Sequence, residues 1–319
     1  MNTKIFDLND MPLSDRNGNY GGNSGDKEGI LINGEYWIVK YPKSVKNLQN
    51  IGTLSYSTSP LSEYLGSQIY HLLGYPVHDT LLGIRDNKVV VACKDFCDDT
   101  HRLIEFRQLK NIHNKELSKV LNRTMQSTGS NHLTNLSVIQ IHLSHNPAIK
   151  NIPKIKERFW DCLVIDGWIN NNDRNNEDWG ILRSKLGDIL SPVYDNGSSF
   201  WPNVSEEELQ SKFKDSRLLL DAAVHGVTAY SLDGIHNAHF SDILQQDIPE
   251  LHQAIKRVVP IILQKIPDCM ELIESVPEQS NGFSIISSTR KEVYKQSLQL
   301  CANLLLKPAL QRVQTSSHD

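Results

Sequence analysis

Short apolar runs separated by turn residues occupy the first third of the chain, and longer runs with helical periodicity occupy the rest. Two pairs of apolar runs each flank a turn-forming dipeptide: 29–32 and 36–41 around Asn33-Gly34, and 80–84 and 88–93 around Asp86-Asn87. Asn, Asp and Gly tolerate the positive φ of tight hairpin turns. The pattern predicts two β-hairpins in an N-terminal, β-rich region.

A single helix is predicted between these hairpins. Ser59-Pro60 suits its start, because serine caps helices and proline fits the first turn, and Gly74 suits its end. The residues at 61, 65, 69 and 72 form one apolar side at helical spacing. Glu63 projects about 160° away from that side at 100° per residue, so it is free to face a cleft.

From about residue 101 the pattern predicts mainly helices. Helical spacing recurs in the segments 117–125, 136–143, 155–169, 205–224, 240–246, 249–264 and 289–306. Thr289 is the expected cap of the last helix, and the polar stretch 97–100 is the expected hinge. We therefore expect an α+β, bilobal protein with a β-rich N-lobe at 1–97 and a helical C-lobe at 98–319.

Two polar loops carry the candidate chemistry. Asp173 lies in an Asn- and Asp-rich loop after an apolar segment, and Asp195 begins an Asp-x-Gly loop after the apolar run 189–194. Phosphoryl transfer needs one carboxylate to orient the attacking hydroxyl, an oxygen ligand nearby and a second carboxylate that holds Mg²⁺. Asp178 lies five residues after Asp173, as such a ligand requires. Either loop alone is also compatible with an ordinary turn.

Two further features favour phosphate chemistry. The glycine-rich segment 18–27 has a composition that lets backbone N–H groups approach phosphate oxygens, although it matches neither common nucleotide-binding motif. Lys40 ends the second strand of the hairpin that follows this segment, where a kinase places its phosphate-binding lysine. Glu63 is the candidate ion-pair partner of Lys40; the alternative for each residue is a solvated surface charge.

Composition limits the classes of protein to which the chain can belong. The chain has 319 residues, a formal charge of −4 and a pI near 6.3, which argues against direct nucleic-acid binding. Its N-terminus lacks the apolar core of a secretory signal, and no apolar stretch is long enough for a membrane helix. Five scattered cysteines do not indicate a disulfide framework. We expect a cytoplasmic enzyme, or an effector delivered to a host cell, without membrane contact.

Several short motifs together resemble the HipA-like serine/threonine kinases of bacteria. They are Tyr20-Gly21-Gly22-Asn23-Ser24-Gly25-Asp26-Lys27, Tyr36-Trp37-Ile38-Val39-Lys40-Tyr41-Pro42, Leu61-Ser62-Glu63-Tyr64, Val90-Val91-Ala92-Cys93-Lys94-Asp95-Phe96, Asn171-Asn172-Asp173-Arg174 and Pro192-Val193-Tyr194-Asp195-Asn196-Gly197-Ser198. The resemblance covers nearly the full length. Because the glycine-rich segment starts near residue 18, it implies a compact branch without the family's extra N-terminal subdomain.

The resemblance implies a bilobal protein-kinase-like fold, ATP and Mg²⁺ as cofactors, and specific roles for individual residues. Lys40, Glu63 and Asp173 become catalytic, with Asp173 as the base, while Asp178 and Asp195 become metal ligands. The implied nucleotide-binding residues are Gly21, Gly22, Asn23, Ser24, Gly25, Lys27, Lys40, Lys94 and Phe96.

The chain departs from the family pattern in its catalytic loop. Asn175 replaces the usual histidine and Asp178 replaces the usual asparagine. Aspartate is an acceptable Mg²⁺ ligand, so activity is expected to be retained, and a weakened nucleotide-binding pseudokinase is the alternative. A small-molecule or lipid kinase on the same scaffold is a further alternative, because it shares these residues.

The resemblance also implies regulation and partners. The family autophosphorylates serines in or near the glycine-rich loop, for which Ser24 and Ser14 are the candidates. A phosphate there would repel the phosphates of ATP. The implied partners are a protein substrate, of which an aminoacyl-tRNA synthetase is one example, and a protein antitoxin that in some systems binds DNA. The chain is thus expected to be a toxin or effector.

Overall fold

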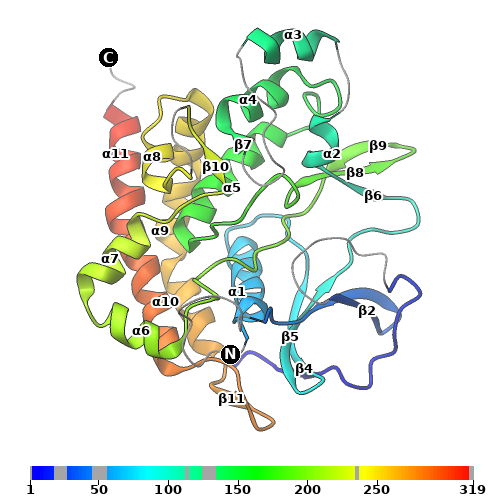
Figure 1. Ribbon diagram of the computed structural model, residues 1–319, viewed down its shortest axis with the longest axis vertical. Coiled ribbons are helices and arrows are strands. Elements are labelled where there is room, and N and C mark those ends of the chain that lie inside the picture. Colours follow the sequence, from blue (N-terminus) through cyan, green and yellow to red (C-terminus); the bar gives the residue numbers. More distant parts are fainter. Residues whose placement is uncertain are drawn as a thin grey trace.

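The computed structural model describes residues 2–17, 27–44, 56–111, 115–123, 134–233 and 237–315. A β-sheet lobe (the N-lobe) lies at one side and most helices (the C-lobe) at the other, with helix α1 between them (Figure 1). The strands are β1 (Phe6–Asp7), β2 (Lys27–Ile32), β3 (Glu35–Lys40), β4 (Thr80–Arg85), β5 (Lys88–Lys94), β6 (Arg102–Glu105), β7 (Thr134–Asn135), β8 (Gly180–Ser184), β9 (Gly187–Leu190), β10 (Tyr230–Ser231), β11 (Gln279–Ser280) and β12 (Phe283–Ser284).

The described helices account for most of the C-lobe. They are α1 (Ser59–Leu72), α2 (Phe106–Lys110), α3 (Lys115–Arg123), α4 (Leu136–His145), α5 (Ile155–Ile169), α6 (Glu206–Phe213), α7 (Ser216–Val224), α8 (Phe240–Leu244), α9 (Pro249–Ser275), α10 (Ser288–Cys301), the π-helical turn Ala302–Leu306 and α11 (Lys307–Thr315). Among the described residues, no helix is both long enough and apolar enough to span a bilayer.

The N-lobe is built on a five-stranded sheet in the order β1-β4-β5-β3-β2. Its two predicted hairpins are confirmed: β2 pairs with β3 and β4 pairs with β5, both antiparallel. Asn33 and Gly34 adopt φ values of 52° and 79°, and Asp86 and Asn87 adopt 50° and 57°. The local turn chemistry therefore sets the register within each hairpin. The pairing of β3 with β5, which are distant in sequence, then brings Lys40, the last residue of β3, opposite Val91.

Helix α1 connects the two lobes. Its start and end agree with the prediction within a residue: Thr58 is the cap position, Ser59 and Pro60 form the first turn, and Gly74 follows the end with φ of 84°. Ser59 is thus the first helical residue and not the cap. The Tyr70 hydroxyl donates to Asp166 of α5 at 2.9 Å, which ties α1 to the C-lobe.

The main hydrophobic core is shared between the lobes through α1. The α1 residues Leu61, Leu65 and Ile69 are buried in one cluster with residues of β4, α5 and α9. A second, smaller core covers another part of the sheet and contains Leu8, Ile30, Trp37, Val39, Val90 and Ala92. Because α1 belongs to the larger core, its position is fixed by both lobes.

Gly66 marks the closest approach of α1 to the loop that begins at Asp195. A Cβ atom at position 66 would lie 2.7 Å from the Asn196 Cβ and 3.1 Å from the Ser199 hydroxyl. Contacts this short require the backbone to shift, so this helix position needs glycine. The helix and the loop are therefore packed with no spare room.

The sequence pattern was wrong for the first segment of the C-lobe. Residues 102–105, expected to begin a helical region, form β6, which pairs with β8 in the three-stranded antiparallel sheet β6-β8-β9. Gly180 of β8 lies directly against the Ile104 carbonyl, and no side chain fits there. Pairing with a distant strand overrides the local preference of this segment.

Three C-lobe helices also differ from their predicted limits. Helix α9 runs to Ser275 although Pro260 and Pro267 lie inside it, and buried Ile266, Cys269 and Ile273 continue its apolar side beyond 264. The segment 205–224 forms two helices, because Asp215 caps a new one at Ser216. Helix α10, for which Thr289 was the predicted cap, is capped by Ser287, whose hydroxyl accepts from the Arg290 N–H.

Candidate active site

A cavity of about 420 Å³ lies between the N-lobe sheet and the two polar loops. It is lined by Lys27, Ile38, Lys40, Tyr41, Lys43, Ser59, Pro60, Glu63, His78, Cys93, Lys94, Phe96, Leu103, Glu105, Asp173, Asn175, Glu177, Asp178, Tyr194, Asp195, Gly197 and Ser198. The eight described residues proposed as catalytic, nucleotide-binding or metal-binding are all among them: Lys27, Lys40, Glu63, Lys94, Phe96, Asp173, Asp178 and Asp195. The remaining nucleotide-binding candidates, Gly21, Gly22, Asn23, Ser24 and Gly25, lie outside the described residues.

Lys40 lies between two carboxylates. Its ammonium nitrogen is 2.8 Å from Glu63 Oε2 and 3.0 Å from Asp195 Oδ1. Burial acts to lower the pKa of Lys40, but the charges of Asp195 and Glu63 outweigh it and raise that pKa well above its ordinary value. The side chain is therefore a permanent cation at the inner end of the cavity.

Glu63 is completely buried and still ionised. Its side chain is 1% exposed, yet its pKa lies well below the ordinary value. Burial acts to raise this pKa, and the Lys40 charge together with the hydrogen bond from His78 overcomes that effect. The helical geometry predicted that Glu63 faces a cleft. The structure shows that Glu63 lines the cavity and that its side chain is almost completely buried there.

The second polar loop presents Asp195 toward Lys40. Asp195 adopts φ of 60°, a left-handed conformation that aspartate tolerates better than most residues. Burial acts to raise its pKa, but Lys40 lowers the pKa below the ordinary value. Asp195 is thus an ionised oxygen donor at the cavity wall.

The first polar loop presents two carboxylates with different surroundings. Asp173 is exposed where it lines the cavity, whereas Asp178 is 8% exposed and accepts a 2.8 Å hydrogen bond from the Asn175 N–H. Burial raises the pKa of Asp178 well above its ordinary value, and the negative charge of Asp195 raises it further. A buried carboxylate beside a second carboxylate is a favourable environment for a cation.

Arg174 joins the two polar loops, a role that the sequence did not reveal. Its guanidinium donates to both oxygens of Asp166, at 2.5 and 3.1 Å. It also donates to the Tyr194 carbonyl at 2.7 Å and to Asn196 Oδ1 at 2.6 Å, the residues on either side of Asp195. The available sequence signal was Asp166, one of two charges (with Asp161) within the otherwise apolar segment 159–169.

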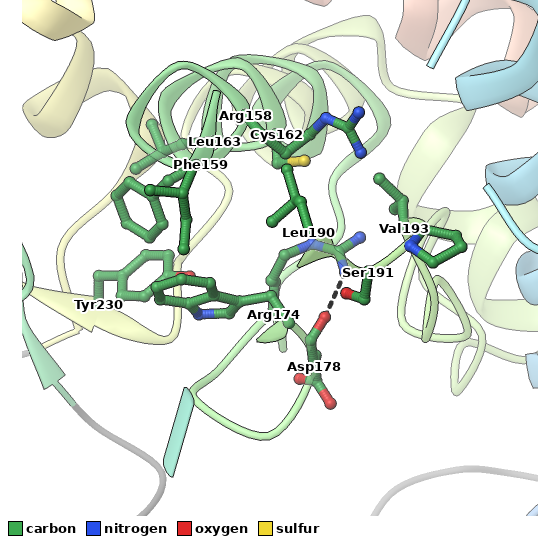
Figure 2. A pocket seen from close by; sticks show the side chains of 13 residues that line it. Arg158, Phe159, Cys162, Leu163, Arg174, Asp178, Leu190, Ser191, Val193 and Tyr230 are labelled. Carbon is green, nitrogen blue, oxygen red and sulfur yellow. Dashed lines mark hydrogen bonds between the residues drawn. The ribbon is translucent and has the colours of Figure 1, made fainter. Parts of the chain in front are cut away.

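A small apolar cavity lies on the other side of the Arg174 side chain. It measures about 30 Å³, and Phe159, Leu163 and Tyr230 contribute to its apolar wall (Figure 2). Figure 2 also shows the hydrogen bond from Arg174 to the Asp178 carbonyl, which is 3.2 Å long. The first polar loop is therefore packed between the large cavity and an aromatic wall of the C-lobe.

Three other predicted residues, Lys94, Phe96 and Ser14, each contact another residue of the N-lobe or of the segment that leads into the second polar loop. Lys94 Nζ is 2.6 Å from Glu35 Oε1, and the Phe96 ring lies 5.6 Å from the Tyr194 ring. Ser14 is 5% exposed and its N–H donates to the Gly29 carbonyl at 2.9 Å. A phosphate can reach the Ser14 hydroxyl only after this segment opens.

Comparison with known proteins identifies relatives of the chain. The serine/threonine-protein kinase CtkA of Helicobacter pylori is 33% identical over 190 residues, which are 59% of this chain and 54% of CtkA. The match thus spans about half the length of that curated relative. No protein-family model matches the chain.

Solved structures extend the similarity to nearly the whole chain. The crystal structure of the H. pylori proinflammatory kinase CtkA matches 98% of this chain and 99% of its own, with a TM-score of 0.83 and 26% identity. HipA, solved with HipB and operator DNA from Shewanella oneidensis MR-1, matches 94% of this chain and 70% of its own, with a TM-score of 0.55 and 12% identity. The predicted bilobal kinase fold and the predicted resemblance are confirmed.

Proposed function

We propose that this chain, a relative of CtkA with the HipA-like kinase fold, is an ATP- and Mg²⁺-dependent serine/threonine protein kinase. The observation that carries the proposal is the Lys40 ammonium, held 2.8 Å from Glu63 and 3.0 Å from Asp195 at the inner end of the cavity. Kinases use such a lysine, fixed by a glutamate, to bind the α- and β-phosphates of ATP.

The proposed roles follow from charge and position. Lys40 binds phosphate oxygens, and Glu63 keeps its ammonium in place. Asp173, exposed at the cavity, accepts the proton of the acceptor hydroxyl. Its exposure supports this role, because an incoming hydroxyl needs access to the base.

Asp178 and Asp195 are the proposed metal ligands. Both offer the carboxylate oxygens that Mg²⁺ prefers. Burial and, after it, the negative charge of Asp195 raise the pKa of Asp178, and a divalent cation would offset both effects. When bound, Mg²⁺ supplies charge neutralisation for the β- and γ-phosphates. Arg174 donates to the Tyr194 carbonyl and to the Asn196 side chain, on either side of Asp195, so the Asp195 carboxylate is already oriented.

The proposal also covers the acceptor of the phosphate, the biological role of the reaction and the compartment in which it takes place. The name of CtkA supports a protein acceptor hydroxyl, and we include autophosphorylation at Ser24 ahead of buried Ser14. The HipA fold supports a growth-inhibiting toxin or effector that a protein antagonist neutralises. We place the reaction in the cytoplasm of the producing cell or of a host cell that receives the protein.

The test is incubation with γ-labelled ATP and Mg²⁺, followed by mass spectrometry of the protein and of candidate acceptor proteins. We expect phosphoserine or phosphothreonine with wild type. Asp173→Ala should lower transfer by about 10³-fold while leaving the nucleotide Kd within about twofold, because the base acts on the acceptor. Nucleotide binding without any transfer by wild type contradicts the proposal and favours a pseudokinase; transfer to a small molecule or lipid alone favours the other class of kinase.

Expression in cells tests the toxin assignment separately. Wild type should slow growth and Asp173→Ala should not, because the proposed toxicity requires phosphate transfer. Equal growth arrest by the two proteins would exclude kinase activity as its cause.

A further inference from the structure

Glu63 has two carboxylate oxygens, and Lys40 contacts one of them. The other oxygen, Oε1, lies 3.0 Å from His78 Nε2 and accepts from the Asn196 N–H, also at 3.0 Å. Glu63 is therefore held from three directions, and each oxygen has its own donors. This arrangement leaves Oε2 directed at Lys40 Nζ, 2.8 Å away.

His78 is itself rigidly placed. It precedes β4, its side chain is 3% exposed, and its N–H donates to the Val193 carbonyl at 3.1 Å. Val77 forms a parallel bridge with Val193, so the backbone before β4 pairs with the backbone that leads into Asp195. The imidazole is thus carried by the connection between α1 and β4, whose backbone pairs with the residues that precede the second polar loop.

The hydrogen-bond pattern assigns the proton on this imidazole. The Glu63 carboxylate is ionised and accepts hydrogen bonds, so Nε2 must carry the hydrogen that it donates to Oε1. Ser67 Oγ, 3.1 Å from the same Nε2, accepts from Asn196 Nδ2 at 2.9 Å. Ser67 and Asn196 therefore support the imidazole from the side and leave Glu63 as its charged acceptor.

A metal ion is the competing explanation for this cluster. Glu63, His78 and Cys93 bring one ligand atom each within 4.8 Å of one another, and all three residues are buried. The Lys40 ammonium, however, already lies 2.8 Å from Glu63 and provides the cation for this carboxylate. Burial raises the pKa of Cys93 well above its ordinary value, which keeps the thiol protonated and a weak ligand.

We propose that His78 is a positioning residue for nucleotide binding: it fixes Glu63 so that the Lys40 ammonium meets the phosphates in one orientation. The inference rests on the proposed kinase function of the same cavity. It adds a residue that the sequence motifs do not mark and that acts through Glu63. Loss of the imidazole therefore lowers nucleotide affinity and leaves the acceptor site unchanged.

The test compares His78→Leu with His78→Gln. Leucine fills the space without a donor, whereas the glutamine amide places an N–H near the position of Nε2. We expect His78→Leu to raise the ADP Kd and the KM for ATP by about tenfold, with an acceptor KM within about twofold of wild type. His78→Gln should restore most of the nucleotide affinity.

His142→Leu is the matched control. His142 is a second buried histidine, 1% exposed, whose Nδ1 lies 3.1 Å from Asn146 Nδ2 in the C-lobe. Both leucine variants remove a buried imidazole and both are expected to lower the melting temperature. Only His78→Leu should change nucleotide affinity, which separates positioning from general destabilisation.

A double-mutant cycle with Glu63→Gln tests the route of the effect. If His78 acts through Glu63, His78→Leu should change the ADP Kd by less than about twofold in the Glu63→Gln background. Independent, multiplicative effects would contradict the proposal, as would an unchanged ADP Kd in His78→Leu alone. If His78→Leu does not fold, the same cycle can be measured with His78→Gln and with Ser67→Ala, which removes the hydroxyl beside the imidazole. The expected loss of ADP affinity is then smaller.

Two controls keep the outcomes distinct. ADP binding requires no turnover, so a wild type that binds ADP without transferring phosphate overturns the proposed function while His78 is still tested. Titration with Zn²⁺ in the absence of nucleotide tests the metal explanation: binding that His78→Leu and Cys93→Ser both abolish would overturn the assignment of His78 to positioning.

Discussion

Glu63 and Asp178 are buried carboxylates on two walls of the same cavity, and their pKa values move in opposite directions. Glu63 is 1% exposed and Asp178 is 8% exposed, so burial opposes ionisation of both. Glu63 receives an ammonium, an imidazole N–H and a backbone N–H. Asp178 receives the Asn175 N–H and faces the negative charge of Asp195.

Because both carboxylates are buried, the difference between their pKa values comes from the charged neighbours and hydrogen-bond donors of each carboxylate and not from its depth of burial. The Glu63 wall contains its own cation and is complete without a ligand. Within the described part of the chain, no ion pair reaches the Asp178 carboxylate, which is one of the two ligands that we propose for the metal. The Glu63 wall thus holds a lysine, and the Asp178 wall is the one that we propose to bind a metal.

The largest expected effect comes from removing the negative charge of Asp195, which acts on both Lys40 and Asp178. Asp195 contacts Lys40 at 3.0 Å and raises the pKa of Asp178, so Asp195→Asn changes both walls. We expect transfer to fall by about 10³-fold or more and Mn²⁺ affinity, measured calorimetrically, to fall with it. Asp188→Asn, on the distant β9 strand, is the control and should behave as wild type. If Asp195→Asn retained its Mn²⁺ affinity, Asp195 would not be a metal ligand.

A pair of isosteric changes tests the comparison directly. Glu63→Gln breaks a buried ion pair and should lower the free energy of unfolding by about 3 kcal/mol. Asp178→Asn removes an uncompensated buried carboxylate and should raise it by about 1 kcal/mol in metal-free protein. Calorimetry in EDTA at neutral pH measures both, and shifts of the same sign would contradict the comparison.

The smallest effect at neutral pH is expected at His142, a buried titratable group that is not part of the cavity lining. Burial, with a smaller contribution from the charge of Lys110, lowers its pKa from 6.5 to about 4. Below pH 6.5 the unfolded chain binds this proton and the folded chain does not, so stability is full above pH 6.5 and decreases as the pH falls toward 4. The loss approaches about 3 kcal/mol.

Chemical denaturation between pH 7 and pH 4 measures this prediction. His142→Asn should remove most of the pH-dependent loss, because the amide has no proton to bind in this range. A slope equal to that of wild type would mean that other groups dominate. Nucleotide affinity at neutral pH should be unchanged in this variant, in contrast to variants of either cavity wall.

The parts of the fold that were predictable depend on local chemistry. The Asn33-Gly34 turn specifies its hairpin, and the periodic apolar side with Gly74 specifies α1. The β6 strand was not predictable, because its partner β8 lies far along the chain and no local signal at 102–105 indicates the pairing. Likewise, the apolar side of α9 continues past two prolines that would normally suggest an earlier end.

The candidate site shows the same division. Spacing and motif resemblance brought together Lys40, Glu63 and Asp195, whose contacts the structure shows. They did not identify His78 or Arg174, because each acts through tertiary hydrogen bonds to residues distant in sequence. A histidine in a short connecting segment has no periodic or motif signal, so its role emerges only when the backbone at Val77 pairs with Val193.

The glycine at position 66 has a consequence for inhibitor design. Some kinase inhibitors depend on space created when the helix that carries the glutamate moves outward. Here that helix contacts the Asn196 loop with no room for one extra carbon atom, and its glutamate is bonded to the same loop. A compound that displaces α1 must break these buried contacts, whereas a compound confined to the 420 Å³ cavity leaves them intact and has the more accessible target.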